Sequence, residues 1–284
     1  MHKLKAEDTY FPTNKYIRIK DNLLDLTIPK VMGVINCTPD SFFKESRKNS
    51  EKEILLQVDK FVKEGVDIID LGGYSSRPGA SHITEQEEIK RIFPALQAIV
   101  KNHPTIPISI DTFRGEVAKI CLENGAHIIN DISAFELDKE LLNVISHYKC
   151  PYILMHMKGN PTTMQENTEY DNIFKSIISF LSAKIEKLEE NGVNDIIIDP
   201  GFGFGKTLDQ NYTLLNQLQD FRILNKPILV GFSRKSMIYK KLNCTPEETL
   251  NGTTILNTSA ILKGASILRV HDVKEAKEII TLLS

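Results

Sequence analysis

Eight short runs of apolar, mostly β-branched residues recur along this chain, and each is followed by a longer segment with helical spacing of apolar positions. The runs begin at Val31, Asp67, Pro107, His127, Pro151, Asp195, Pro227 and Ser266, and the helical segments lie near residues 51–64, 85–101, 114–124, 138–148, 171–191, 209–219, 247–263 and 273–282. Because the runs do not alternate between apolar and polar residues, they predict strands of a parallel sheet that is buried on both faces. Eight such βα units favour a closed (β/α)8 TIM barrel of the α/β class, and a doubly wound open sheet is the alternative.

Signals at the ends of the segments support this alternation. Ser50 and Thr84 each stand three residues before a glutamate, which is the spacing of a helix capping box. Glycine occupies the expected helix ends at positions 65, 125 and 192. We therefore expect helices to begin after Ser50 and Thr84.

The segment before the first unit has a different pattern. KYIRI, then Asp21-Asn22, then LLDLT predicts a β-hairpin with its turn at Asp21-Asn22. We expect this hairpin to plug the N-terminal end of the barrel. The chain then divides into an N-terminal hairpin extension over residues 1–29 and a barrel domain over residues 30–284.

Charge and composition exclude several classes of partner. The formal net charge is −2 and the basic residues are dispersed, so no patch for nucleic acid is expected. No stretch reaches the ~18 apolar residues of a membrane span, and the first residues lack the apolar region of a signal peptide. The four cysteines are far apart and have no zinc spacing, which favours a reducing compartment. We therefore expect a cytoplasmic protein.

Polar residues end nearly every predicted strand, and their charges are sorted. The C-terminal ends of barrel strands form the active site in this fold. Carboxylates and amides belong to one group of strands and cations to another, namely Asp111, Asn130 and Asp199 against Lys235, Arg269 and Arg77. This sorting favours a site that holds a hydrogen-bond-donating ring on one side and an anion on the other. A barrel with capped strand ends and no site would not explain it.

Three other features give weaker evidence of function. PGFGFGKT resembles a phosphate-binding P-loop, but that motif needs glycine where Pro200 stands. Cys37 could be a nucleophile, yet no base is placed beside it, so we interpret it as a small packing residue. His156 has no second ligand at zinc spacing, so we interpret it as a histidine of the barrel rim.

Eight motifs together resemble those of the bacterial dihydropteroate synthases, a family of pterin-binding barrels, and the resemblance spans roughly residues 30 to 284. In chain order the motifs are VMGVINCTPDSF, DIIDLGGYSSRPGA, ISIDTFR, HIINDIS, LMHMKGNPTTMQ, IIIDPGFGFGK, LVGFSRKSM and ILRVHDV. The resemblance implies a transferase of folate biosynthesis that condenses 6-hydroxymethyl-7,8-dihydropterin pyrophosphate with p-aminobenzoate through a C–N bond. It also implies inhibition by sulfonamides, a Mg2+ cofactor and a homodimer.

The resemblance further implies a role for individual residues. The catalytic set is Asp111, Lys235, Arg269 and His271. The pterin contacts are Asp111, Asn130, Met155, Asp199, Phe204, Gly231 and Lys235. The pyrophosphate contacts are Asn36, Arg77, Arg269 and His271, with Asn36 also holding Mg2+. The p-aminobenzoate contacts are Ser76, Arg77, Pro78 and Ser233.

Three segments depart from the family pattern. Phe43-Lys44-Glu45-Ser46 replaces the usual continuation of the first loop, Ser76 and Tyr74 replace a common Thr and Glu, and NGTTILNTSA is unusually polar for the dimer helix. Two other functions stay open: a pterin-binding methyltransferase barrel, against which the SRPG and SRK runs argue, and a non-catalytic paralogue, which would have lost the reacting residues kept here.

Overall fold

The eight predicted strands form one parallel sheet that closes on itself. The computed structural model describes residues 14–37, 47–75, 82–161, 163–164, 166 and 168–284. The strands are β3 (Lys30–Asn36), β4 (Ile68–Gly72), β5 (Ile108–Asp111), β6 (Ile128–Asp131), β7 (Tyr152–Met155), β8 (Ile196–Asp199), β9 (Leu229–Val230) and β10 (Ile267–Val270), paired in the order β8-β7-β6-β5-β4-β3-β10-β9. A parallel bridge between Ile198 and Ile228 joins the two ends of this order. The TIM barrel prediction is confirmed, and the open-sheet alternative is wrong.

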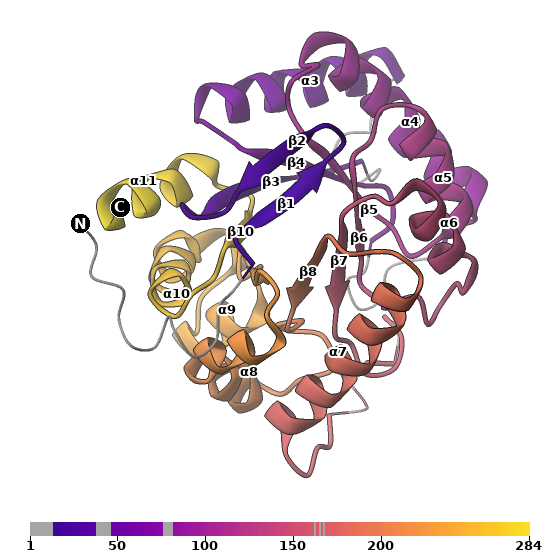
Figure 1. Ribbon diagram of the computed structural model, residues 1–284. Helices are drawn as coiled ribbons and strands as arrows, with labels where there is room; N and C mark the ends of the chain where they lie inside the picture. Colours follow the sequence, from indigo (N-terminus) through magenta and orange to yellow (C-terminus); the bar gives the residue numbers. More distant parts are fainter. Residues whose placement is uncertain (1–13, 38–46, 76–81, 162, 165, 167) are drawn as a thin grey trace.

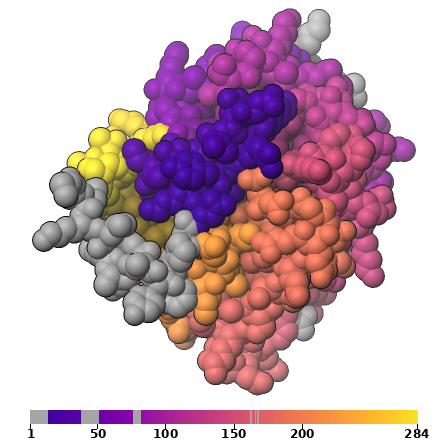
Figure 2. Space-filling model, viewed as in Figure 1, coloured from indigo at the N-terminus to yellow at the C-terminus, as the bar shows by residue number. Residues whose placement is uncertain are grey.

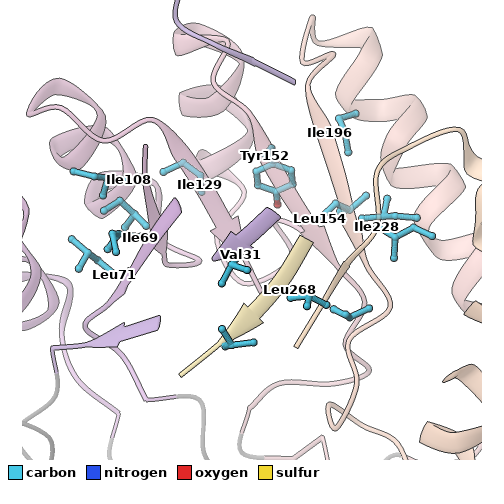
Figure 3. Packing of buried hydrophobic residues seen from close by; sticks show 14 of the residues in the cluster. Val31, Ile69, Leu71, Ile108, Ile129, Tyr152, Leu154, Ile196, Ile228 and Leu268 are labelled. Atoms are coloured by element: carbon cyan, nitrogen blue, oxygen red, sulfur yellow. The ribbon is translucent and has the colours of Figure 1, made fainter. Parts of the chain in front are cut away.

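Helices surround the barrel, as Figure 1 shows. The helices that follow the strands are α3 (Arg47–Lys63), α4 (Glu85–Asn102), α5 (Gly115–Glu123), α6 (Glu140–Tyr148), α7 (Ile173–Glu190), α8 (Leu208–Asn216), α10 (Leu250–Leu262) and α11 (Val273–Leu283). Alternate strand residues, such as Val31, Ile69 and Leu268, pack in the apolar layer between strands and helices (Figure 3). The other residues of each strand point into the barrel, so they are available either to fill it or to form a site.

Several predicted boundaries need correction. Helix α3 begins at Arg47, so Ser50 lies inside the helix and does not cap it. Thr84 does cap α4, because its hydroxyl accepts a hydrogen bond from the N–H of Glu87 at 3.2 Å. The short helix α9 (Ser236–Leu242) and the 3-10 helices η1 (Leu218–Leu224) and η2 (Pro246–Glu248) were not predicted, because none is long enough to show a helical period.

The N-terminal hairpin covers one end of the barrel. Strands β1 (Tyr16–Ile19) and β2 (Asn22–Asp25) are antiparallel, and Ile19 pairs with Asn22. The turn is therefore Lys20-Asp21, one residue earlier than predicted, and Lys20 has a φ of 53°. Figures 1 and 2 show the hairpin lying across the barrel. The division at residue 29 stays a prediction.

The hairpin packs by its apolar face. Its buried residues Ile17, Ile19 and Leu26 form one cluster with the first inward-facing residues of the strands, namely Met32, Ile68, Ile128, Ile153, Ile197, Leu229 and Ile267. This apolar layer closes the N-terminal end of the barrel. Among the described strands, the polar residues at the C-terminal ends are therefore the ones available for chemistry. No helix in the described ranges is long and apolar enough to cross a membrane.

If the hairpin is a structural plug, truncating its buried side should be costly. Ile17 is 0% exposed and Leu23 is 67% exposed. Ile17→Ala should lower the free energy of unfolding by about 2 to 5 kcal/mol, because a cavity forms beneath the barrel. Leu23→Ala is the matched control and should change it by about 0.5 kcal/mol or less. Urea unfolding measures both, and equal values for the two variants would contradict the plug.

Candidate active site

Strand register brings the predicted carboxylates and amides together at the C-terminal end of the barrel. The sheet pairs Asp111 of β5 with Asn130 of β6, and Met155 of β7 with Asp199 of β8. Asn130, Met155 and Asp199 are 5%, 3% and 6% exposed, respectively. These four residues, which the resemblance assigned to one subsite, therefore end four neighbouring strands at the same end of the barrel.

Arg269 of β10 links two carboxylates across the barrel. Its Nε donates to Asp70 Oδ2 at 2.7 Å, and its Nη2 donates to Asp111 Oδ2 at 2.6 Å. Asn130 Nδ2 also donates to Asp70 Oδ2, at 3.1 Å. Asp70 itself is 0% exposed. A fully buried carboxylate needs such partners, so this network fixes the guanidinium in one orientation.

Sequence reasoning missed Asp70, because it considered only residues that end a strand. Asp70 lies in the middle of β4, among four apolar or glycine residues. An isolated carboxylate in a strand expected to be buried on both faces was the signal that could have found it.

The charges of this network shift one another's pKa. Burial raises the pKa of Asp111 to about 7, against the effect of Arg269, and the nearby Asp70 carboxylate adds to the rise. Burial lowers the pKa of Arg269, but Asp70 and Asp111 outweigh it and hold that pKa above its usual value. The guanidinium therefore remains charged.

Lys235 lies beside the aromatic ring of Phe204. Its Nζ donates to the carbonyl of Phe202 at 2.5 Å and lies 5.0 Å from the centre of the Phe204 ring. Burial lowers the pKa of Lys235 to about 8, and the Asp199 carboxylate opposes that shift. A Cβ at Gly231 would lie 3.6 Å from the Cβ of Arg269, so glycine leaves the space between the two cations open.

A buried lysine shapes the loop after β8. Lys206 is 3% exposed, and its Nζ donates to the carbonyls of Gly201 and Phe204 at 2.7 and 2.9 Å. A Cβ at Gly201 would approach the carbonyl oxygen of His156 to 1.9 Å, so only glycine fits this loop. Burial lowers the pKa of Lys206 to about 7, although Asp199 opposes the shift. The rejection of a P-loop here stays a prediction, and sequence reasoning did not recognise Lys206 as the residue that organises the loop.

His156 and Cys37 are both buried, as their interpretation as a rim residue and a packing residue requires. His156 is 5% exposed, its Nδ1 lies 3.2 Å from Lys206 Nζ, and burial lowers its pKa to about 3, so it is a buried neutral histidine of the rim. Cys37 is 0% exposed, and burial raises its pKa to about 12. A thiol that stays protonated is not a nucleophile, so Cys37 acts as a small packing residue.

Ser233, which follows β9, and His271, which follows β10, contact each other. His271 Nδ1 lies 2.9 Å from Ser233 Oγ. Sequence reasoning assigned these residues to different subsites, so those two subsites adjoin. Asn36 ends β3, the strand that pairs with β10. Ser76, Arg77 and Pro78 lie outside the described residues, as do residues 43–46 of the first loop.

Comparison with known proteins places this geometry in context. Residues 32–271 match the family model described as pterin binding enzyme. The dihydropteroate synthase of Escherichia coli strain K12 is 42% identical over 257 residues, which make up 90% of each chain. A Yersinia pestis dihydropteroate synthase structure with a sulfonamide drug has a TM-score of 0.88 and 36% identity, covering 94% of this chain and 98% of that one. A Xanthomonas albilineans dihydropteroate synthase structure with 4-aminobenzoic acid has a TM-score of 0.88 and 33% identity, covering 95% and 97%.

The ion pair between Arg269 and Asp70 leads to a stability prediction. Arg269→Ala leaves the Asp70 carboxylate buried without its cation, so the free energy of unfolding at pH 8 should fall by about 3 to 5 kcal/mol. Adding Asp70→Asn removes that charge and should recover part of the loss. Denaturant unfolding of the single and double variants tests this, and a double variant no more stable than Arg269→Ala would contradict it.

Proposed function

The chain belongs to the dihydropteroate synthases, which are pterin-binding enzymes, and from this membership we propose how its site works. The reaction is the condensation of 6-hydroxymethyl-7,8-dihydropterin pyrophosphate with p-aminobenzoate, which gives 7,8-dihydropteroate and pyrophosphate in folate biosynthesis. The enzyme is a transferase that forms a C–N bond. The carrying observation is that Asp111, Asn130, Asp199 and Lys235 gather at the C-terminal end of the barrel, where Asn130 and Asp199 are buried and Arg269 is joined to Asp111.

The pterin would lie among these residues. A pterin ring presents adjacent N–H donors on its pyrimidine edge, and the carboxylate of Asp199 with the amide of Asn130 can pair with them. Phe204 and Met155 supply apolar surface for the ring faces, and both belong to the same apolar cluster. Gly231 keeps room for a flat ring between Lys235 and Arg269. This arrangement is our reason for assigning the pterin subsite to these residues.

The reaction would proceed by charge stabilisation. The C–O bond to pyrophosphate breaks first, and the oxygen keeps the electron pair. The methylene carbon then carries positive charge, which the Asp111 carboxylate offsets while Arg269 and His271 stabilise the leaving anion. The amine of p-aminobenzoate attacks that carbon with its lone pair, forms the C–N bond and then loses one proton to water, which gives the neutral amine of the product. No covalent bond to the enzyme is needed.

We propose Mg2+ as the cofactor, with a single protein ligand at the C-terminal end of the barrel. In the described ranges no group of three or more His, Cys, Asp or Glu side chains could hold a metal ion. Mg2+ commonly takes one or two protein oxygens and completes its shell with substrate phosphates and water, so one amide oxygen is enough. Asn36 would hold the ion together with the pyrophosphate. Bound there, Mg2+ would neutralise negative charge on the leaving group.

The arylamine subsite would adjoin the pyrophosphate subsite. Ser233 contacts His271, which is our reason for placing the carboxylate of p-aminobenzoate near the leaving group. Ser76, Arg77 and Pro78 would complete this subsite. The Yersinia relative was solved with a sulfonamide drug and the Xanthomonas relative with 4-aminobenzoic acid, so we propose that sulfonamides compete for the same place here.

We also propose that the enzyme is a homodimer in the cytoplasm. Helix α10 exposes Ile255 and Leu262 at 57% and 69%, seven residues apart on one face. Two large apolar side chains exposed on one side of this otherwise polar helix favour burial against a second copy. All four cysteines are free, which agrees with a reducing compartment.

Pyrophosphate release tests the reaction directly. The enzyme with Mg2+ and the pterin substrate should release pyrophosphate in turnover amounts only when p-aminobenzoate is added. Asp111→Asn should keep pterin binding but lower turnover by roughly 10²-fold, because the carbocation loses its counter-charge. No release with both substrates would indicate a non-catalytic paralogue, and near-normal turnover by Asp111→Asn would remove the proposed role of this residue.

Sedimentation tests the dimer. Ile255→Glu with Leu262→Glu should convert a dimer to a monomer, because two charges cannot be buried without partners. Leu23→Glu, at an equally exposed position on the hairpin, is the control and should leave the mass unchanged. A monomeric wild-type protein would refute the proposal.

A further inference from the structure

Lys206 is a buried lysine that the proposed reaction does not use, and its nitrogen lies within the loop between β8 and α8. Its Nζ donates to the carbonyls of Gly201, Phe204 and His156 at 2.7, 2.9 and 3.3 Å. His156 Nδ1 lies 3.2 Å from the same nitrogen. An ammonium group has three protons to donate and accepts none, so these acceptors occupy its protons. Lys206 therefore binds the protein and has no proton left for a substrate.

The three carbonyls come from two separate loops. Gly201 and Phe204 belong to the loop after β8, whereas His156 follows β7. The His156 carbonyl oxygen would lie only 1.9 Å from a Cβ at Gly201, so the two loops also touch through their backbones. Converging carbonyl oxygens repel one another, and a buried carbonyl that lacks a donor costs free energy. A donor with several protons at their centre, such as Lys206, is what allows the two loops to pack in this way.

The loop after β8 carries or contacts three groups that are assigned to the pterin. Its Gly201 N–H donates to Asp199 Oδ1 at 2.7 Å, which fixes the orientation of that carboxylate. Its Phe202 carbonyl accepts from Lys235 Nζ at 2.5 Å, and its Phe204 ring lies 5.0 Å from the same nitrogen. Asp199, Lys235 and Phe204 therefore take their positions from one short loop.

We propose that Lys206 is a positioning residue for the pterin substrate, because it folds the loop that orients Asp199 and Phe204. This inference rests on the proposed function, which assigns those two residues to the pterin. Lys206 itself touches no substrate. A loop that is already folded in the free enzyme loses little conformational freedom on binding, so more of the contact free energy appears as affinity. The pyrophosphate contacts Arg269 and His271 lie on β10 and directly after it, so the effect of Lys206 falls on the pterin and not on the anion.

Binding of two separate probes distinguishes this role from a general structural one. The pterin probe is 6-hydroxymethyl-7,8-dihydropterin without its pyrophosphate, and the anion probe is pyrophosphate with Mg2+. Lys206→Met keeps an unbranched side chain and removes its donors. The Kd for the pterin probe should rise about tenfold, while the Kd for pyrophosphate stays within about twofold of the wild-type value. Calorimetry measures both, and equal changes in the two Kd values, or no change in either, would overturn the proposal.

A lysine two residues after His156 provides a matched control. Lys158 is exposed, and its Nζ donates to the carbonyl of Glu169 at 2.5 Å, outside the loop after β8. Lys158→Met should therefore leave the Kd for the pterin probe within about twofold of the wild-type value. A similar loss of pterin affinity in both variants would show that the buried contacts of Lys206 are not the cause, and would overturn the proposal.

A milder variant covers the case in which Lys206→Met does not fold. Lys206→Gln keeps an amide donor for the loop carbonyls, so its Kd for the pterin probe should rise about threefold, and its Kd for pyrophosphate should not change. An unchanged pterin Kd in a folded Lys206→Gln enzyme would overturn the proposal.

Hydrogen exchange reports on the loop without any ligand. The Gly203 N–H donates to Asn211 Oδ1 at 2.7 Å. The Phe204 N–H donates to the carbonyl of Gly201 at 3.1 Å. In Lys206→Met these two amides should exchange faster than in wild type, while those of β8 keep their rates. Unchanged exchange at Gly203 and Phe204 would overturn the role of Lys206 in folding the loop. Failure of the wild-type enzyme to bind either probe, with the exchange result as expected, would instead overturn the proposed function.

Discussion

The contact between Ile198 and Ile228 closes the sheet, and every functional feature depends on that closure. Strand β9 closes the sheet but has only two residues. It therefore pairs with β8 mostly through the residues that directly precede β9. Closure nevertheless forces the carboxyl ends of all the strands into one ring. Lys235, which follows β9, then reaches the carbonyl of Phe202, which follows β8. The opposite end is sealed by the apolar hairpin.

A ring of buried charges is stable only when each charge has a partner. Asp70 obtains Arg269 and Asn130, Asp199 accepts the N–H of Gly201 at 2.7 Å, and Lys206 is surrounded by carbonyls. These partners are supplied by the protein before any substrate arrives. The groups are therefore already oriented, which is a condition for electrostatic catalysis. The same contacts that permit burial of the charges make the site rigid.

The sequence was sufficient to predict the strands and their polar ends, because both depend on local pattern. It was not sufficient for residues whose roles are set by distant partners. Asp70 lies in the middle of a strand, and its role depends on Arg269 of β10, with which it pairs. Lys206 lies in a glycine-rich run, and its carbonyl partners come from the folded path of that run. The start of α3 was misplaced because a capping spacing at Ser50 also fits inside a helix.

Tyr74 shows how a departure from a family pattern can be compatible with the site. The resemblance places a glutamate commonly at this position, where a carboxylate would compete with Glu88 for Arg114. A tyrosine leaves that ion pair intact and offers its ring to the same guanidinium and to Phe113. The charge of Arg114 is then balanced by Glu88, and the Tyr74 ring is held by packing. Because Phe113 follows Asp111 by two residues and packs in the cluster of Met155 and Phe204, the Tyr74 ring is continuous with the apolar surface at this end of the barrel.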